Sequence, residues 1–167
     1  RGIANTEISS NLALSLGKAF AIYLTQSTQS EEIKIVIGRD TRTSGDMLVS
    51  AFVAGAMSMG INVLDVGICP TPCVSYLVRE LGVNGGVVIT ASHNSNPYNG
   101  IKLMDSKGAK LDTDIEFEIS QIFHNITDYL CDTRVGRLVV DTDLPKRWAD
   151  YLISCAKDID LDKFNII

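Results

Sequence analysis

The segment that begins at Ser92 and ends at Lys102 concentrates side chains that could carry out nucleophilic chemistry. A serine hydroxyl is a weak nucleophile unless a base, a low-dielectric pocket or a metal ion assists it. His93 and Lys102 could supply the proton transfer and the positive charge that Ser92 would need. Asn94 and Asn99 could present N–H donors to an oxyanion. These residue types are compatible with chemistry on an anionic small molecule.

An ordinary surface loop is the alternative interpretation of the same segment. Ser95-Asn96-Pro97 and Asn99-Gly100 are both typical of turns. A lysine or a histidine taken alone is also more often solvated than catalytic. The turn signals by themselves therefore leave both interpretations open.

Short apolar runs alternate with helical patterns on both sides of this segment. Runs rich in β-branched residues predict four strands, at 33–37, 62–68, 87–90 and 101–104. Apolar residues at helical spacing predict five helices, at 6–23, 43–59, 71–81, 113–123 and 145–156. Such alternation implies helices on both faces of the sheet, so we expect a three-layer α/β/α sandwich with a mixed, mostly parallel sheet of about four strands. In open sheets of this kind ligands bind beyond the carboxyl ends of the strands, and the polar segment follows the strand expected at 87–90.

The ends of the chain suggest how the domain is bounded. We expect residues 1–157 to form one α/β/α domain and residues 158–167 to begin a following domain that is truncated. The chain starts at Arg1 with neither an initiator Met nor the pattern of a signal peptide. We therefore expect a fragment of a longer enzyme.

The composition of the chain indicates which partners and which cellular compartment to expect. The chain has 15 Lys and Arg against 20 Asp and Glu, a net charge of −5, and its basic residues are scattered. General nucleic-acid binding needs a concentrated basic face, so we expect no nucleic-acid partner. No apolar run approaches the roughly 18 residues of a membrane span, so we expect no membrane partner. Cys69 and Cys73 are interpreted as small buried hydrophobes, which predicts a reduced, cytoplasmic protein.

Four motifs in order resemble those of one enzyme family. The segments Thr90-Ala-Ser-His-Asn94 and Tyr98-Asn-Gly-Ile-Lys102 resemble the phosphoserine loop of the α-D-phosphohexomutase superfamily, the phosphoglucomutases and phosphomannomutases. Arg1-Gly2 resembles the end of the family's first motif, Gly38-Arg-Asp-Thr-Arg42 its arginine turn, and Val66-Gly-Ile-Cys-Pro-Thr-Pro72 its third motif. The match covers essentially the whole chain as the family's first domain.

The resemblance implies a role for each matching residue. Ser92 would carry a phosphate and pass it to a hexose monophosphate, and the bisphosphate would turn round and return its other phosphate. Lys102 would act as general acid and base and offset charge on the migrating group. His93 and Asn94 would position the phosphate and the sugar hydroxyls, and Arg1 would contact the transferring phosphoryl group.

The resemblance also implies a Mg²⁺ cofactor and partners outside this chain. In the family, Mg²⁺ bridges the phosphoserine to three aspartates of a second domain, and no such loop occurs in this sequence. Ser92, through its phosphate, would be the single metal ligand here. We interpret Asp141-Thr-Asp143 as turn chemistry instead. The partners would be a hexose phosphate and the remaining domains of the polypeptide, and the fragment alone would be inactive.

Several alternatives stay open at this level. The family usually has Pro directly after the Ser-His-Asn triplet, whereas Ser95-Asn96 precede Pro97 here, so we expect an altered loop path with retained chemistry. Tyr98 before Asn-Gly favours glucose or mannose phosphate over glucosamine phosphate as substrate. A phosphoglucosamine mutase domain and a non-catalytic sugar-phosphate-binding domain are the alternatives. We interpret Arg39 and Arg42 as structural, paired with Asp40, Asp46 or neighbouring strand ends.

Overall fold

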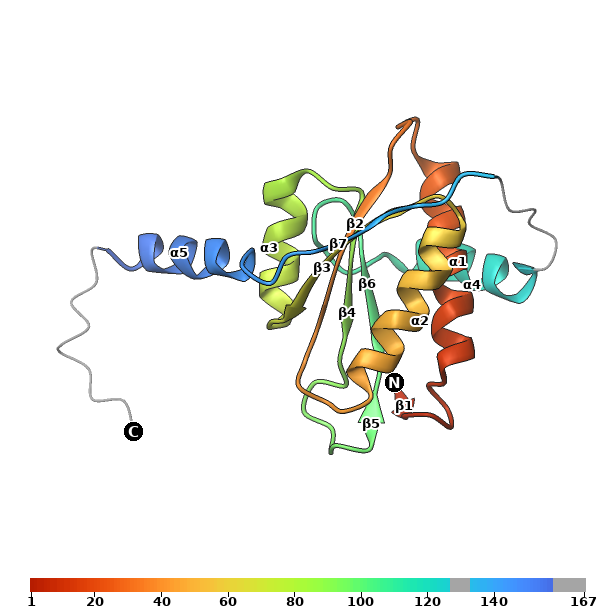
Figure 1. Ribbon diagram of the computed structural model, residues 1–167, viewed down its shortest axis with the longest axis horizontal. Helices are drawn as coiled ribbons and strands as arrows, with labels where there is room; N and C mark the ends of the chain where they lie inside the picture. Colours follow the sequence, from red (N-terminus) through yellow and green to blue (C-terminus); the bar gives the residue numbers. More distant parts are fainter. Residues whose placement is uncertain (127–132, 158–167) are drawn as a thin grey trace.

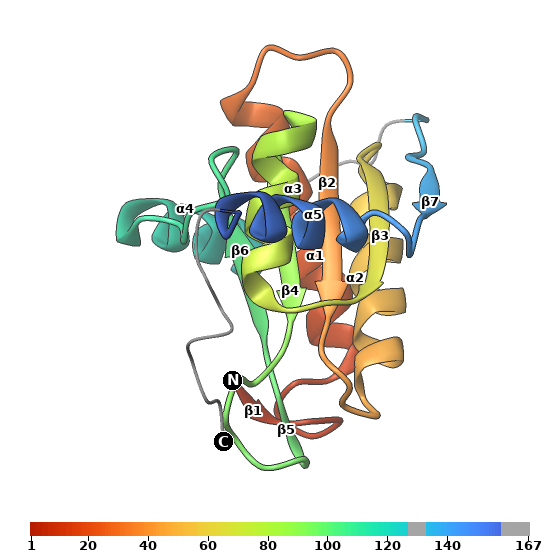
Figure 2. The same cartoon turned by 90° about the vertical axis from the view of Figure 1, so that its left-hand side faces the viewer.

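The computed structural model describes residues 1–126 and 133–157, which fold into three layers (Figures 1 and 2). The strands are β1 (Gly2–Ile3), β2 (Lys34–Arg39), β3 (Asn62–Ile68), β4 (Gly85–Ile89), β5 (Tyr98–Asn99), β6 (Ile101–Met104) and β7 (Leu138–Val140). The helices are α1 (Ser10–Ser27), α2 (Gly45–Ser58), α3 (Thr71–Leu81), α4 (Thr113–His124) and α5 (Pro145–Cys155). The expected three-layer α/β/α architecture is confirmed.

The central sheet has the order β6-β4-β2-β3-β7 within the described residues. β2 is parallel to both β3 and β4, β3 is parallel to β7, and β6 is antiparallel to β4. The mixed, mostly parallel character is therefore as expected, with β7 as a fifth strand that the apolar pattern did not predict. β7 is only three residues long and all three are exposed, so no buried period marks it.

Each face of the sheet is covered by its own apolar cluster. On one face Phe20 of α1 and Phe52 of α2 pack with the strands, and α4 joins them through Ile119. On the other face Leu77 of α3 packs against Val88 of β4 and neighbouring strand residues. Figure 1 shows the same division, with α3 on one side of the sheet and α1, α2 and α4 on the other.

Helices α1 and α2 approach one another closely because glycine lies at both sides of their crossing. A Cβ atom added at Gly17 would overlap the carbonyl oxygen of Phe52, and one added at Gly55 would overlap the carbonyl oxygen of Leu14. The two backbones are therefore in direct contact at this point. No side chain larger than hydrogen fits at either glycine without moving a helix.

The side-chain caps that the sequence suggests at two helix starts are not formed. The sequence around Thr43 and Thr113 suggests capping boxes, but neither α2 nor α4 has a side-chain cap hydrogen bond. The Ser44 hydroxyl accepts a hydrogen bond from Asn99 instead, and Asp46 forms an ion pair with Arg39. At α2, Ser44 and Asp46 therefore bind Asn99 and Arg39 in place of the backbone of the first helical turn.

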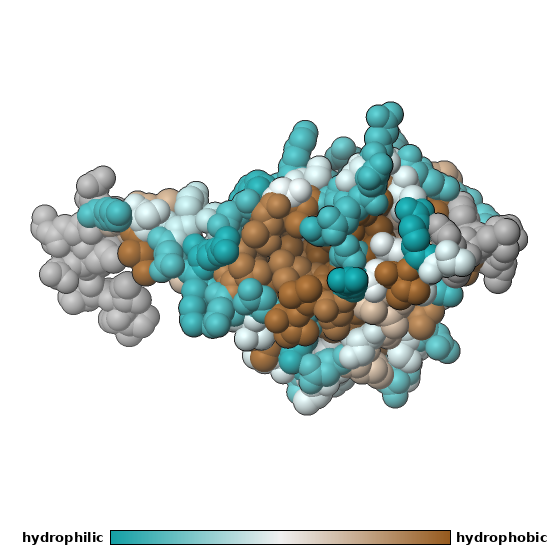
Figure 3. All heavy atoms as spheres, turned by 45° about the horizontal axis from the view of Figure 1, so that its top comes forward, coloured by the Kyte–Doolittle hydropathy of each residue, from teal (hydrophilic) through white to brown (hydrophobic). Residues whose placement is uncertain are grey.

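Two further features of the fold are its buried thiols and the apolar side chains on its surface. Cys69 and Cys73 are buried and free, as expected, and burial raises the pKa of Cys69 to about 12, with Cys73 adding to the shift. Figure 3 shows apolar side chains gathered in the middle of one face, and exposed apolar residues include Val140 of β7 and Ile153 of α5. Within the described ranges, no helix combines the length and apolar character that crossing a membrane requires. The following domain expected at 158–167 falls outside the described residues.

Candidate active site

The carboxyl ends of the parallel strands β2, β3 and β4 meet at one edge of the sheet. The turn after β2 begins at Asp40, and the loop after β4 begins at Thr90. These two segments lie beside the chain's N-terminus at the lower end of the molecule in Figure 1. This is the edge at which open α/β sheets bind ligands.

A separate two-stranded sheet brings the N-terminus to this loop. β1 pairs antiparallel with β5, and Gly2 lies opposite Asn99. Arg1 therefore lies beside Gly100, where an added Cβ would be 3.0 Å from the Arg1 Cγ atom and 3.0 Å from the Thr90 carbonyl oxygen. Glycine at position 100 leaves the space that Arg1 occupies.

Ser92 is exposed and has a left-handed backbone conformation, with φ of 60°. Non-glycine residues adopt this region at a cost, so surrounding contacts must hold it. The Ser92 N–H donates to the Thr90 hydroxyl over 2.9 Å. The Ser92 Oγ atom and the His93 Nδ1 atom lie 3.4 Å apart. The predicted nucleophile is thus accessible and has an imidazole within reach.

The guanidinium of Arg42 lies at the centre of the loop that carries Ser92. Its Nη1 atom donates to the carbonyl oxygens of Ser95 and Tyr98 over 2.6 and 2.9 Å. Its Nη2 atom donates to the carbonyl oxygens of Ser92 and Asn94 over 3.0 and 2.6 Å. The side chain of Arg42 is only 10% exposed. The sequence predicted an ion pair for Arg42 and missed these four contacts.

Asp40 anchors Arg42 and the start of the loop at once. Its carboxylate accepts hydrogen bonds from Arg42 Nε over 3.0 Å and from the Thr90 hydroxyl over 2.6 Å. Burial raises the pKa of Asp40, but the hydrogen bonds from Thr90 and Arg42 and the charge of Arg42 outweigh it, so that pKa lies below its ordinary value. The expected ion pairs of Arg42 with Asp40 and of Arg39 with Asp46 are both confirmed.

Asn99 has a structural position and not the oxyanion-binding role considered from the sequence. It is completely buried, and its Nδ2 atom donates to the Ser44 hydroxyl over 2.8 Å. Its Oδ1 atom accepts from the Gly100 N–H over 2.8 Å. The amide therefore ties β5 to the start of α2 and has no donor directed at a ligand.

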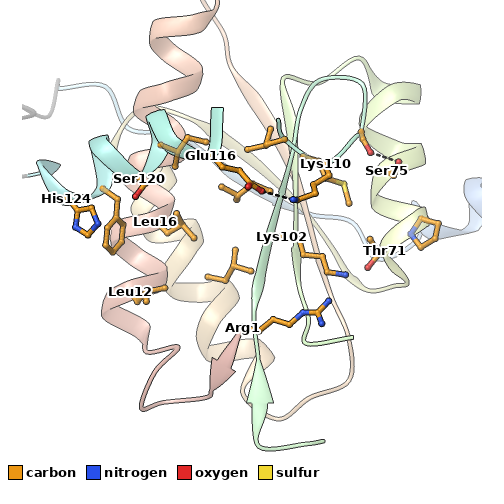
Figure 4. Close-up of a pocket in the computed structure, with 18 residues that line it drawn as sticks. Arg1, Leu12, Leu16, Thr71, Ser75, Lys102, Lys110, Glu116, Ser120 and His124 are labelled. Atoms are coloured by element: carbon orange, nitrogen blue, oxygen red, sulfur yellow. Dashed lines mark hydrogen bonds and ion pairs between the residues drawn. The ribbon is translucent and has the colours of Figure 1, made fainter. Parts of the chain in front are cut away.

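Arg1 and Lys102 line a groove of about 1000 Å³ beside the edge strand β6 (Figure 4). In this view both side chains extend toward Thr71 at the start of α3. Neither cation has a hydrogen bond or ion pair within residues 1–126 and 133–157. The rest of the groove is mostly apolar, with Leu12 and Phe123 among its lining residues. Two cations without carboxylate partners can attract an anion to this end of the groove.

The structure divides the predicted site residues into two groups. Ser92, His93 and Asn94 lie on the loop after β4, and Ser92 is not a lining residue of the groove. Arg1 and Lys102 lie in the groove. Across the described part of the chain, no hydrogen bond links one group to the other. A ligand reaching from the loop into the groove would join them.

The described residues do not form a magnesium site by themselves. No group of three or more His, Cys, Asp or Glu side chains suited to a metal ion occurs in the ranges that the structure covers. The oxygens of Asp40 are engaged by Arg42 and Thr90. Asp141 accepts a hydrogen bond from the Asp143 N–H, and Asp143 pairs with Lys146, which confirms the turn interpretation.

Comparison with known proteins gives concordant results along the chain. The family model for phosphoglucomutase/phosphomannomutase, alpha/beta/alpha domain I, matches residues 1–130. The phosphoglucosamine mutase of Clostridioides difficile (strain 630) is 45% identical over 157 residues, which is 92% of this chain and 35% of that protein. The phosphoglucosamine mutase of Alkaliphilus metalliredigens (strain QYMF) is 44% identical over 155 residues, 91% of this chain and 34% of that protein. The chain spans about a third of the length of the curated relatives it matches.

A solved structure supports the fold comparison. The crystal structure described as a putative phosphomannomutase from Thermus thermophilus superimposes with a TM-score of 0.77 at 26% sequence identity. The superposition covers 96% of this chain and 35% of that one. Nearly all of this fold thus has a counterpart within a longer protein.

Proposed function

Because the chain belongs to the phosphoglucomutase/phosphomannomutase family, as its alpha/beta/alpha domain I, we propose that it supplies the phosphoserine of an intramolecular phosphotransferase. In this proposal Ser92 carries the phosphoryl group that interconverts a hexose 1-phosphate and a hexose 6-phosphate through a bisphosphate. The proposal concerns the longer parent protein, to which residues 1–157 contribute the domain that holds Ser92.

One observation carries this proposal: Ser92 is exposed on a firmly held loop, at the sheet edge where two cations lack carboxylate partners in the described ranges. A phosphoserine has a charge near −2 at neutral pH, and a second anion can approach it only if cations offset that charge. The guanidinium of Arg1 has the planar fork that suits phosphate oxygens, and Lys102 adds a compact positive charge. His93, with Nδ1 at 3.4 Å from Ser92 Oγ, would help to hold the phosphate.

In the proposed transfer each of these residues has one task. A sugar hydroxyl oxygen attacks the phosphorus, a new P–O bond forms, and the bond from phosphorus to Ser92 Oγ breaks. The proton of the attacking hydroxyl must reach the Ser92 oxygen, and Lys102 is the group that we assign to this relay. Asn94 would contact the sugar hydroxyls. The second half-reaction reverses these steps with the other phosphate of the bisphosphate, so the enzyme ends phosphorylated again.

The substrate that we propose is glucosamine phosphate, the alternative left open by the sequence. The curated relatives at 44 and 45% identity are both named phosphoglucosamine mutase. Glucose or mannose phosphate is the second candidate, which Tyr98 favours from the sequence and which the name of the Thermus thermophilus structure supports. Assay of the parent enzyme with each sugar phosphate distinguishes the two.

The cofactor and the compartment are part of the same proposal. The phosphate on Ser92 would be one ligand of a Mg²⁺ ion, and the others would come from parts of the parent protein outside this chain, because the described carboxylates do not form a site. Those other parts and the sugar phosphate are the partners we propose. The free, buried thiols of Cys69 and Cys73 favour a reducing, cytoplasmic compartment.

Substitution of Ser92 in the full-length parent tests the proposal. Ser92→Ala should lower turnover of the sugar phosphate by at least about 1000-fold, because the group that accepts phosphate is lost. Ser95→Ala is the matched control, since Ser95 contributes its carbonyl and not its hydroxyl to the loop contacts. Intact mass measurement should show one phosphate on the wild type and on Ser95→Ala, and none on Ser92→Ala. Undiminished turnover by Ser92→Ala would refute the proposal.

A further inference from the structure

We propose that Arg42 is a positioning residue for phosphoryl transfer, which orients the loop peptides around Ser92 without contacting the substrate. This inference rests on the proposed function of Ser92. It assigns to Arg42 a role beyond the ion pair with Asp40 that the sequence predicted.

All the side-chain N–H donors of Arg42 are engaged in holding the loop and in binding Asp40. A guanidinium has five N–H donors in one plane. One donates to Asp40, and the other four donate to four carbonyl oxygens of the loop. A lysine ammonium has three donors and no planar fork, so it could not satisfy this set. The backbone from Ser92 to Tyr98 is therefore held by hydrogen bonds to one side chain.

These contacts act directly on the backbone of Ser92. Its carbonyl oxygen accepts from Arg42, and its N–H donates to the Thr90 hydroxyl. Both peptide groups that flank the Ser92 side chain are thus held, which accounts for the left-handed φ of 60°. Without Arg42, the peptide after Ser92 could rotate and Ser92 could relax to an extended conformation. The hydroxyl would then no longer have one fixed direction.

The same contacts determine where the loop N–H groups point. In a planar trans peptide the C=O and N–H bonds point in opposite directions. Carbonyls directed at Arg42 therefore turn the N–H groups of His93, Ser95 and Asn96 away from it. None of these three N–H groups has a hydrogen-bond partner within the described residues. They form a set of oriented donors beside Ser92, and such donors stabilise phosphate oxygens.

Burial and charge separate Arg42 from the residues that would bind substrate. Its side chain is 10% exposed, and its charge is offset by the adjacent carboxylate of Asp40. Arg1 and Lys102, in contrast, line the groove and have no carboxylate partner in the described ranges. Loss of Arg42 should therefore affect the rate of transfer more than the affinity for the sugar phosphate.

Kinetics of Arg42→Ala in the full-length parent test this role. Misplacement of a reacting group by about 1 Å can lower a rate on the order of 100-fold, so we expect kcat to fall by about that factor while KM changes by less than about 3-fold. Millimolar guanidinium ion should restore part of the lost kcat, because it can occupy the vacated space. Arg39→Ala is the control: Arg39 is the last residue of β2, and its side chain pairs with Asp46 and donates to the Asp40 carbonyl, with no hydrogen bond to the loop after β4 in the described ranges. Its kcat should be that of the wild type.

Amide hydrogen exchange of the peptide covering residues 91–99 gives a readout that does not depend on turnover. Exchange should be at least about 10-fold faster in Arg42→Ala than in the wild type and in Arg39→Ala, since the loop loses its central contacts. If the wild type has no mutase activity, the proposed function fails. Faster exchange would in that case still support the loop-holding role of Arg42.

Two results would overturn the inference. They are wild-type kcat in Arg42→Ala, with or without a rise in KM, and unchanged exchange over residues 91–99. If Arg42→Ala does not fold, Arg42→Lys takes its place. This variant keeps a cation beside Asp40. It should show the same fall in kcat, and guanidinium ion should not restore it. Wild-type kcat in Arg42→Lys would equally overturn the inference.

Discussion

The hydroxyl of Thr90 donates a 2.6 Å hydrogen bond to the carboxylate of Asp40, which joins the ends of β4 and β2. The same hydroxyl accepts a hydrogen bond from the Ser92 N–H, so it links Asp40 to the backbone of Ser92. Thr90 itself is 6% exposed. The start of the loop after β4 is therefore held by a partly buried polar link between neighbouring strands.

Replacement of Thr90 tests this link through stability. Thr90→Val keeps the shape of the side chain but removes the Thr90 partner from both Asp40 and the Ser92 N–H. We expect the free energy of unfolding in urea to fall by about 1–3 kcal/mol. Thr90→Ser keeps the hydroxyl and should lose clearly less than Thr90→Val. Equal losses in the two variants would contradict a role for the hydroxyl.

Acid should weaken the fold through Asp40. The pKa of Asp40 is lower in the folded protein than in the unfolded chain, where it is about 3.9. The ionised carboxylate therefore stabilises the fold above that unfolded value, and the stabilisation is lost as the pH falls through the lower folded value. We expect the free energy of unfolding of the wild type to decrease more steeply than that of Asp40→Asn as the pH is lowered below about 4. Parallel curves from urea titrations at several pH values would show that Asp40 is not responsible.

The contact between α1 and α2 should tolerate no side chain at its two glycines. Gly17→Ala and Gly55→Ala each place a methyl group on a backbone carbonyl, and we expect a loss of about 3 kcal/mol or more in the free energy of unfolding. Gly82→Ala is the control, because its Cβ would meet nothing within 4 Å and only the positive φ of 61° opposes it. That strain costs about 1–2 kcal/mol. A smaller loss in Gly55→Ala than in Gly82→Ala would disprove the close contact.

Removal of the Lys102 ammonium should impair turnover in the full-length parent. Lys102→Met keeps the length of the side chain but neither carries a proton nor offsets phosphate charge, so kcat should fall by about 100- to 10,000-fold. Lys34→Met serves as the comparison, since Lys34 pairs with Glu32 at the start of β2 and lies away from the loop after β4. Its kcat should match the wild type within experimental error. Comparable losses in both variants would remove the special role of Lys102.

The 167-residue chain alone should turn over no sugar phosphate. It spans about a third of its curated relatives, and its described carboxylates form no metal site. A coupled assay of the purified chain with Mg²⁺ and each sugar phosphate checks this expectation. Turnover above that of the Ser92→Ala chain would mean that residues outside this chain are dispensable.

Much of the fold follows from local patterns in the sequence. The observed bounds of β3, α3 and β6 coincide with the predicted ranges 62–68, 71–81 and 101–104. Buried apolar periods and a proline near the start of α3 mark these elements, and both are properties of neighbouring residues. β1, β5 and β7 were not predicted, because each is very short and exists only through pairing with a distant segment. Such pairing leaves no period of its own in the sequence.

The candidate site, too, was predicted in part from the sequence and in part became clear only from the structure. The residue types at Ser92, His93 and Lys102 predicted chemistry on an anionic small molecule, and their place after the strand expected at 87–90 predicted the edge of the sheet on which it would lie. Phosphoryl transfer was predicted only from the four motifs that resemble the phosphohexomutases. The resemblance led us to expect Arg1 at this site, but only the tertiary structure shows how it reaches this edge, through the β1–β5 pairing of segments that are far apart in the sequence. Only the tertiary structure also shows that Arg42 donates hydrogen bonds to four carbonyl oxygens that lie 50 to 56 residues away in the sequence. A side chain's local neighbours indicate its chemistry, whereas its partners across the sheet depend on which strand ends the packed core brings together.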